Sequence, residues 1–217
     1  MQKSLYSLIL SDSVVSKIDM LALKKGTNRS NLINMILADY LSLTTPEMRI
    51  ENIFRQVEKM LSVYDNIVPV LTPNRPTMSV KTTLEYKYRP TLKYDVHLYR
   101  EIKNGAIGQL SVSLRTQSEA LISVTDEFFE FFIRLESSYL PMMLKHPVKY
   151  CYGDGKFVRS IMFDSTKDND LNDVADSISA YIKCFDDIIK GTVSGKYSFE
   201  EADEKYRSYL NSINVII

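Results

Sequence analysis

The sequence predicts an α+β protein, in which a strand and two helices precede a larger domain that has an antiparallel sheet and packed helices. Three observations lead to this prediction. Apolar residues alternate in "LYSLIL", residues 5–10, and change to helical spacing at Ser11-Asp12. A period of two returns between residues 84 and 114. Spacings of three and four mark the segments at 50–64 and 171–189.

The composition is that of an ordinary globular protein. The chain has 217 residues, of which 45% are hydrophobic and 25% charged, enough for one large or two small domains. It contains neither the roughly 20 apolar residues of a membrane helix nor a signal peptide, so we expect a cytoplasmic protein without a membrane partner. Free Cys151 and Cys184 fit a reducing compartment. With only two histidines and no Cys/His cluster, we expect neither a metal site nor a cofactor.

The net charge is zero, but the charges are unevenly distributed. Residues 1–45 contain five basic and three acidic side chains, and residues 75–115 contain eight basic and three acidic ones. Residues 164–204 reverse the balance, with eleven acidic and four basic side chains. This asymmetry favours a polyanion as the partner of the front of the molecule. The more common alternative is a solvated face or an internal match between the basic and the acidic regions.

The first 45 residues predict a strand, a helix, a tight turn and a second helix. Ser11 or Asp12 is the expected N-cap of the first helix, and Gly26 is its expected C-cap. Asn28 is the expected N-cap of the second helix. A unit of about forty residues is too small to enclose a core, and a lone strand leaves its backbone groups unpaired. We therefore expect two copies of the chain to form a dimer through this unit.

The order of these elements resembles the ribbon-helix-helix DNA-binding proteins, the family that includes Arc and MetJ. The matching segments are "LILSDSVVSKID", "KKGTNRSN" and "LINMILADYL", and the resemblance covers residues 1 to about 45. In that family the strands of two copies pair into an antiparallel ribbon that enters the major groove, and four helices make the shared core. The resemblance implies double-stranded DNA and a second copy of the chain as partners.

The resemblance also implies roles for individual residues. The expected dimer core contains Tyr6, Leu8, Leu10, Ile33, Ile36 and Leu37. The side chains expected at base edges are Lys3, Leu5, Ser7 and Ile9. Those expected at a phosphate, where the second helix begins, are Asn28, Arg29 and Ser30. Leu5 and Ile9 depart from the family's polar pattern, since they offer only apolar contact, for example with thymine methyls. The alternative for Arg29 is a solvated side chain beside a plain helix cap.

Residues 46–77 predict a helix followed by a proline-rich connection, and residues 78–217 predict the larger α+β domain. Pro46 ends the second helix and opens an amphipathic one, for which core packing is the preferred role. Strands are expected around 84–88, 92–98 and 110–114, with a turn at Asn104-Gly105 and a further strand at 120–124. A phenylalanine-rich helix capped at Ser123 or Thr125, a hairpin at 153–155 and two closing helices complete the domain.

The exposed face of this meander has the residue types of a nucleic-acid platform. Its basic residues are Lys81, Lys87, Arg89, Lys93, Arg100 and Arg115, and its tyrosines are Tyr86, Tyr88, Tyr94 and Tyr99. Lysine and arginine attract phosphate, and rings stack on bases. The preferred alternative is a solvated sheet, because strand alternation places several of the tyrosines on the buried side.

No constellation of nucleophile, base or metal ligands occurs, so we assign no catalytic residues and expect no enzyme. The preferred function is that of a homodimeric, sequence-specific DNA-binding protein of bacterial, phage or plasmid origin. Transcriptional repression is the task that the resemblance implies, and an accessory role in plasmid partition or transfer stays open. The alternative is a protein-interaction inhibitor or adaptor. There, residues 78–217 bind a protein partner and do the main work, while the amino-terminal domain autoregulates its gene.

Overall fold

The computed structural model describes residues 5–71, 76–86, 88–163, 171–213, 215 and 217, with the side chains of 171 and 172 excepted. The helices are α1 (Asp12–Lys24), α2 (Arg29–Tyr40), α3 (Pro46–Leu61), α4 (Glu119–Tyr139), α5 (Leu171–Val193) and α6 (Phe199–Ser212), with a 3-10 turn at Leu140–Met142. The strands are β1 (Val68–Leu71), β2 (Thr77–Thr83), β3 (Thr91–Lys103), β4 (Ala106–Arg115), β5 (Tyr150–Gly153) and β6 (Lys156–Met162). The protein is α+β, as the sequence predicted.

These strands form one antiparallel sheet in the order β1-β2-β3-β4-β6-β5. The β3–β4 turn lies at Asn104-Gly105 and the β5–β6 turn at Asp154-Gly155, where the sequence predicted turns. All four turn residues have positive φ, between 51° and 78°, which is the geometry of a two-residue hairpin turn. The chain therefore reverses tightly at both places, and the β3–β4 register shifts between Leu98 and Lys103.

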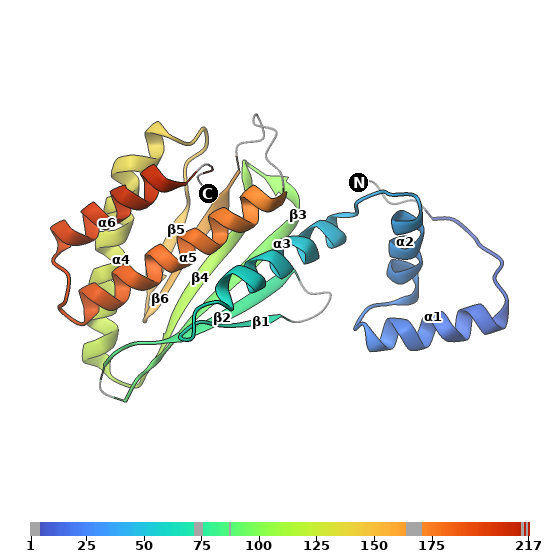
Figure 1. The fold of residues 1–217 in the computed structure, drawn as a ribbon, viewed down its shortest axis with the longest axis horizontal. Helices are drawn as coiled ribbons and strands as arrows, with labels where there is room; N and C mark the ends of the chain where they lie inside the picture. Colours follow the sequence, from blue (N-terminus) through green and yellow to red (C-terminus); the bar gives the residue numbers. More distant parts are fainter. Residues whose placement is uncertain (1–4, 72–75, 87, 164–170, 214, 216) are drawn as a thin grey trace.

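The helices α3 to α6 all cover one face of the sheet (Figure 1). In β3 the buried Leu92, Tyr94, Val96 and Leu98 alternate with residues that are only partly buried. The aromatic face of α4 packs here as expected: Phe129 stacks on Phe157 of β6 with 5.4 Å between ring centroids. One layer of helices on one layer of sheet encloses the core and leaves the outer face of the sheet to polar side chains.

The strand predicted at 84–88 is wrong, because the sheet residues lie earlier in the chain. Tyr88 has a φ of 66°, which a strand does not allow, and the turn between β2 and β3 occupies this segment. In β2 the buried Thr82 takes a core position because its hydroxyl donates to the Asp186 Oδ1 of α5 at 2.7 Å. Residues 68–71, predicted as an irregular connection, form β1; Pro69 is tolerated there because β1 is an edge strand.

The strand predicted at 120–124 is also wrong, since α4 begins at Glu119. Ser118 is the N-cap, and its hydroxyl accepts a hydrogen bond from the Leu121 N–H at 3.3 Å. The expected caps Ser123 and Thr125 lie inside the helix. Leu121, Thr125 and Phe128 are buried at spacings of four and three, so the longer helical period prevails over the short apolar run.

The helix α3 packs into the core of the larger domain. Thr45 is its N-cap, with Pro46 in the first turn. Five apolar side chains of α3 are buried in the same cluster as residues of β3 and α5: Ile50, Ile53, Phe54, Val57 and Leu61. The preferred role of core packing is confirmed.

A buried ion pair connects α4 to β6. The Glu136 side chain is 0% exposed and that of Arg159 1%, and Arg159 Nη1 lies 3.4 Å from Glu136 Oε1. Tyr206 of α6 donates to the same carboxylate oxygen at 3.0 Å. Arg159 Nη2 donates to the Ile217 carbonyl oxygen at 2.6 Å. The charges are removed from water, so each depends on the other.

We expect Glu136→Ala to lower the free energy of unfolding by about 3–5 kcal/mol, because it leaves the Arg159 guanidinium buried without its carboxylate. Glu130→Ala is the matched control, since Glu130 pairs with Arg134 on the exposed side of the same helix; it should cost about 0.5 kcal/mol or less. Denaturant unfolding followed by circular dichroism measures both. Equal losses would show that the buried pair has no special role.

We expect alkaline unfolding that coincides with ionisation of buried tyrosines. Burial and then the Asp186 charge raise the pKa of Tyr94 well above the usual 10.0, and burial also raises the pKa of Tyr181 and Tyr206. A pKa raised by folding contributes stability that is complete below pH 10 and is lost as the pH rises further. Tyrosinate absorbance and circular dichroism should therefore change together above pH 10 for these residues. Complete ionisation of all tyrosines in a chain that keeps its helix signal would refute this.

Candidate nucleic-acid interface

The two amino-terminal helices are joined by the turn that the sequence predicted. Gly26 has a φ of +63°, and its N–H donates to the Leu23 carbonyl at 3.1 Å. The Thr27 N–H donates to the Ala22 carbonyl at 2.9 Å. These two bonds form a Schellman motif, in which a left-handed residue satisfies the last carbonyls of α1. The chain then reverses within a few residues, so that α2 begins beside the end of α1.

The start of α2 is exposed and carries the three residues expected at a phosphate. Asn28 is the N-cap as predicted, and its side-chain oxygen accepts from the Asn31 N–H at 2.9 Å. The N–H groups of Arg29 and Ser30, in the first turn, have no partner inside the helix. The aligned peptide dipoles add partial positive charge at this end. The arrangement is suited to holding an anion.

Arg29 itself is engaged by a carboxylate of α1. Its Nε lies 2.7 Å from Asp19 Oδ1 and its Nη2 lies 2.5 Å from Asp19 Oδ2. Hydrogen bonding to Arg29 lowers the pKa of Asp19, and the same bonds raise the pKa of Arg29. The pair is about half exposed, so water and salt weaken it. The Arg29 guanidinium is therefore held at the start of α2, where the Asp19 carboxylate competes with any phosphate for it.

The strand predicted at residues 5–10 is not formed in the single chain, and α1 is the first regular element of the described residues. Leu5 and Ile9, expected to point at bases, are fully exposed, and Ser7 is exposed too. Lys3 lies outside the described residues. The segment also takes no part in the sheet, whose edges are β1 and β5. The described part of the single chain therefore shows the two helices and the turn but not the strand of a ribbon-helix-helix unit.

The residues expected in the dimer core do not close a core within one chain. Tyr6 is 82% exposed, Leu8 62% and Leu37 49%. Leu10 and Ile36 are also exposed and Ile33 is partly buried. Within α1 and α2 the buried side chains are those of Ala22, Leu32 and Ala38. The apolar sides of both helices consequently face solvent.

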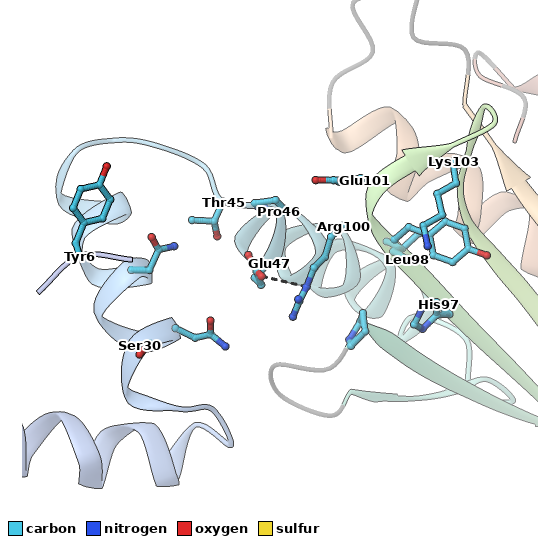
Figure 2. Close-up of a pocket in the computed structure, with 14 residues that line it drawn as sticks. Tyr6, Ser30, Thr45, Pro46, Glu47, His97, Leu98, Arg100, Glu101 and Lys103 are labelled. Atoms are coloured by element: carbon cyan, nitrogen blue, oxygen red, sulfur yellow. Dashed lines mark ion pairs between the residues drawn. The ribbon is translucent and has the colours of Figure 1, made fainter. Parts of the chain in front are cut away.

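A hollow of about 790 Å³ separates α2 from the β3–β4 end of the sheet (Figure 2). Tyr6 and Ser30 line it on one side, and His97 and Lys103 on the other. The ion pair between Arg100 Nε and Glu47 Oε1, 3.2 Å long, crosses its floor between β3 and α3. In the single chain Tyr6 therefore lies near the end of α2 that leads to Thr45, and Ser30 lies toward the other end (Figure 2).

Of the four tyrosines considered for a nucleic-acid platform, only Tyr99 lies on the outer face of the sheet, which agrees with the preferred alternative of a solvated sheet. Tyr94 is buried on the helix side, where its hydroxyl donates to Asp186 Oδ1 at 2.8 Å. Tyr86 and Tyr88 lie in the turn between β2 and β3, and Lys87 is outside the described residues. Arg89 lies in the same turn and Arg100 pairs with Glu47. The basic side chains Lys81, Lys93 and Arg115 do lie on the outer face of the sheet.

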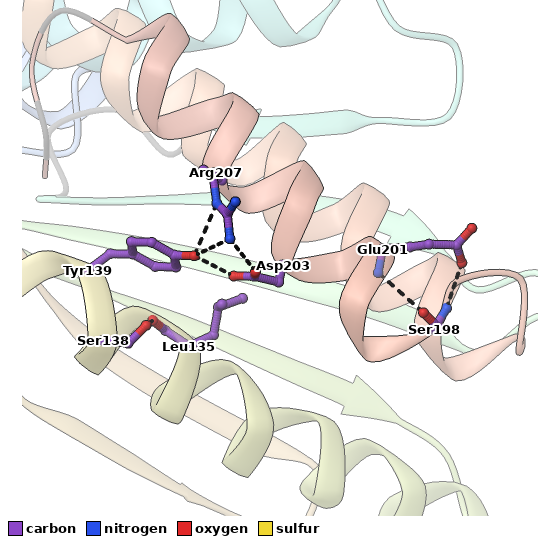
Figure 3. Close-up of polar contacts among 7 residues, drawn as sticks. All are labelled: Leu135, Ser138, Tyr139, Ser198, Glu201, Asp203 and Arg207. Atoms are coloured by element: carbon purple, nitrogen blue, oxygen red, sulfur yellow. Dashed lines mark hydrogen bonds and ion pairs between the residues drawn. The ribbon is translucent and has the colours of Figure 1, made fainter.

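A polar cluster on the opposite side of the molecule has a structural role. The Tyr139 hydroxyl donates to Asp203 Oδ1 at 2.7 Å and accepts from Arg207 Nη2 at 3.0 Å (Figure 3). These contacts fix α6 against the end of α4. At the start of α6, Ser198 and Glu201 form a capping box. The partly buried cluster of Tyr139, Asp203 and Arg207 holds the two helices together.

Comparisons with protein-family models, with curated proteins and with solved structures find no match. In the described ranges no helix is long and apolar enough to cross a membrane. Among the same residues no three His, Cys, Asp or Glu side chains are grouped so that they could hold a metal ion. The partnership of Arg29 with Asp19 could not be predicted from the sequence, since ten residues and a turn separate them and no periodicity marks the pair.

We expect Asp19→Asn to strengthen binding to duplex DNA, because it frees the Arg29 guanidinium for a phosphate. The slope of log affinity against log salt concentration should become steeper by about 0.9, the change expected for one additional phosphate contact. Asp39→Asn is the matched control: Asp39 is exposed on α2 and its loss changes the charge equally. Anisotropy titrations of labelled duplex over a salt series measure both variants. Identical slopes for the two would mean that Arg29 does not contact phosphate.

Proposed function

We propose that this protein is a homodimeric, sequence-specific DNA-binding protein, in which residues 5–10 of two copies pair into a ribbon. The observation that carries the proposal is the exposed apolar segment in front of two helices that close no core. A second copy satisfies both needs at once. It supplies a strand edge for the backbone and apolar faces for Leu8, Leu10 and Leu37.

Burial favours this pairing over solvation. Leaving apolar side chains in water forfeits about 25 cal/mol for each Å² that a partner would cover. The exposed apolar residues of this unit are Leu5, Tyr6, Leu8, Ile9, Leu10, Val14, Met20, Leu21, Leu23, Ile36, Leu37, Tyr40, Leu41 and Leu43. Such a concentration in one short unit is typical of an interaction surface, whereas single exposed apolar residues are ordinary.

The DNA partner is supported by the start of α2. Two copies would present two helix N-termini, each with its free N–H groups and with Arg29 in the first turn. In ribbon-helix-helix proteins, which the order of elements resembles, this position holds a phosphate on either side of the ribbon. Leu5 and Ile9 would then meet the groove with apolar side chains, and Ser7 would be the hydrogen-bonding residue between them. Repression of transcription is the task we propose.

The test uses the full-length protein and a set of DNA duplexes that together cover the region upstream of its gene. Leu37→Glu should shift the protein from dimer to monomer in sedimentation and abolish binding to the upstream region, because it places a charge in the proposed core. Val63→Glu is the control, since Val63 is 78% exposed beyond α3; this variant should remain a dimer and bind. Ser7→Ala should change which upstream sequences are preferred and leave the dimer intact.

A monomer that binds its upstream region, or a dimer that Leu37→Glu does not affect, would contradict the proposal. If the Leu37→Glu monomer keeps its full activity in the cell, the function resides in the larger domain, as expected for an inhibitor or adaptor.

A further inference from the structure

The outer face of the six-stranded sheet carries a row of basic side chains. Cross-strand partners join Lys81 of β2 to Lys93 of β3, Lys93 to Ser113 of β4, and Ser113 to Lys156 of β6. Directly opposed residues lie on the same face of a sheet, so these four side chains point the same way. Arg115 lies on this face too, because it follows Ser113 by two residues along β4.

Little negative charge balances this row. Asp95 is next to it on β3, and its carboxylate accepts from Lys93 Nζ at 2.8 Å and also bonds the Ser79 hydroxyl. No carboxylate in the described residues forms an ion pair with Lys81, Arg115 or Lys156. Like charges opposite one another, such as Lys81 and Lys93, disfavour a sheet. Lys93 is partly buried and paired with Asp95, whereas Lys81, Arg115 and Lys156 are exposed.

The helix layer has the opposite sign. Helices α5 and α6, on the other side of the sheet, carry an excess of acidic residues: Asp173, Asp176, Asp186, Asp187, Glu200, Glu201, Asp203 and Glu204 against Lys183, Lys190, Lys205 and Arg207. The two charges are thus segregated onto the two sides of the larger domain. A surface of one sign attracts a partner of the other.

We propose that the outer face of the sheet is a second, sequence-independent surface for the phosphate backbone of duplex DNA. From Lys81 to Lys156 the row crosses three strand intervals, about 14 Å. A duplex carries about eight charges over that length. The inference stands beside the proposed function and does not depend on it, since it concerns side chains of a different part of the chain.

The chemistry of the face favours backbone contact over base stacking. The side chains directly between and beside the basic ones include Ser111, Ser113, Thr91 and Val158, none of which can stack on a base. The rings of His97 and Tyr99 share this face farther along β3, where they contact each other with 5.5 Å between centroids. Tyr94, the ring that would belong to such a platform, is buried on the other side. Two copies packed face to face would oppose lysine with lysine, so a second copy does not fit this surface.

The test compares two triple variants of the full-length protein on a random-sequence duplex over a salt series. Lys81→Gln/Arg115→Gln/Lys156→Gln should reduce the slope of log affinity against log salt by two to three, about 0.9 for each phosphate that is no longer neutralised. The control Lys59→Gln/Arg134→Gln/Lys196→Gln removes the same charge from exposed positions on α3, α4 and the turn before α6; its slope should match the unchanged protein. Equal denaturation midpoints verify that both variants fold.

An unchanged slope in the sheet variant, or an equal reduction in both variants, would overturn the inference. Weaker binding by the sheet variant to vesicles of anionic lipid, with duplex binding unaffected, would overturn the choice of nucleic acid. The outcome is distinguishable from that of the proposed function, because Arg29→Gln tests the amino-terminal unit on the upstream region separately. A sheet variant that still prefers the upstream region leaves the proposed function standing, whatever its salt slope on random-sequence duplex. A salt slope that falls in a protein without sequence preference supports the sheet surface alone.

Discussion

Residues 5–10 carry backbone donors and acceptors that the sheet of the same chain does not pair. Water can satisfy these groups while the segment is exposed, but a strand forms only with a partner edge, and the apolar side chains beside the groups favour removal from water. The two helices that follow share the difficulty, since only small or isolated side chains such as Ala22 and Leu32 are buried between them. The same missing partner would complete the strand and the helices, which makes dimerisation the economical solution for the whole unit.

The larger domain does not need a second copy of the chain to complete its core. Its helices cover one face of the sheet with a dense aromatic core, and buried polar contacts lock the layers together. Asp186 illustrates this: it accepts from Thr82 of β2, Tyr94 of β3 and Lys190 of its own helix. Each of these contacts links α5 to the sheet or fixes the carboxylate. The domain can therefore serve as a rigid body behind the amino-terminal unit, and its open basic face remains available for a polyanion.

Short sequence signals predicted the turns and helix caps, which depend on neighbouring residues. Gly26 and Asn28 mark the turn between α1 and α2, and the Asn104-Gly105 pair marks the β3–β4 hairpin, because left-handed backbone and capping geometry select these residues. Contacts between distant segments escaped prediction. Thr82 is buried only because Asp186 lies 104 positions later, and Arg29 meets Asp19 across a turn. The resemblance to a ribbon predicted a strand that one chain cannot form by itself.

Hydrogen exchange of the amides of residues 5–10 in the full-length protein, followed as the protein concentration is raised, probes the missing pairing without DNA. We expect these amides to exchange freely in dilute protein and to become protected as dimers form, with bonded and unbonded positions alternating along the segment. Free exchange of the segment in a protein that sedimentation shows to be dimeric would refute the ribbon. Protection that persists in the monomer would do the same.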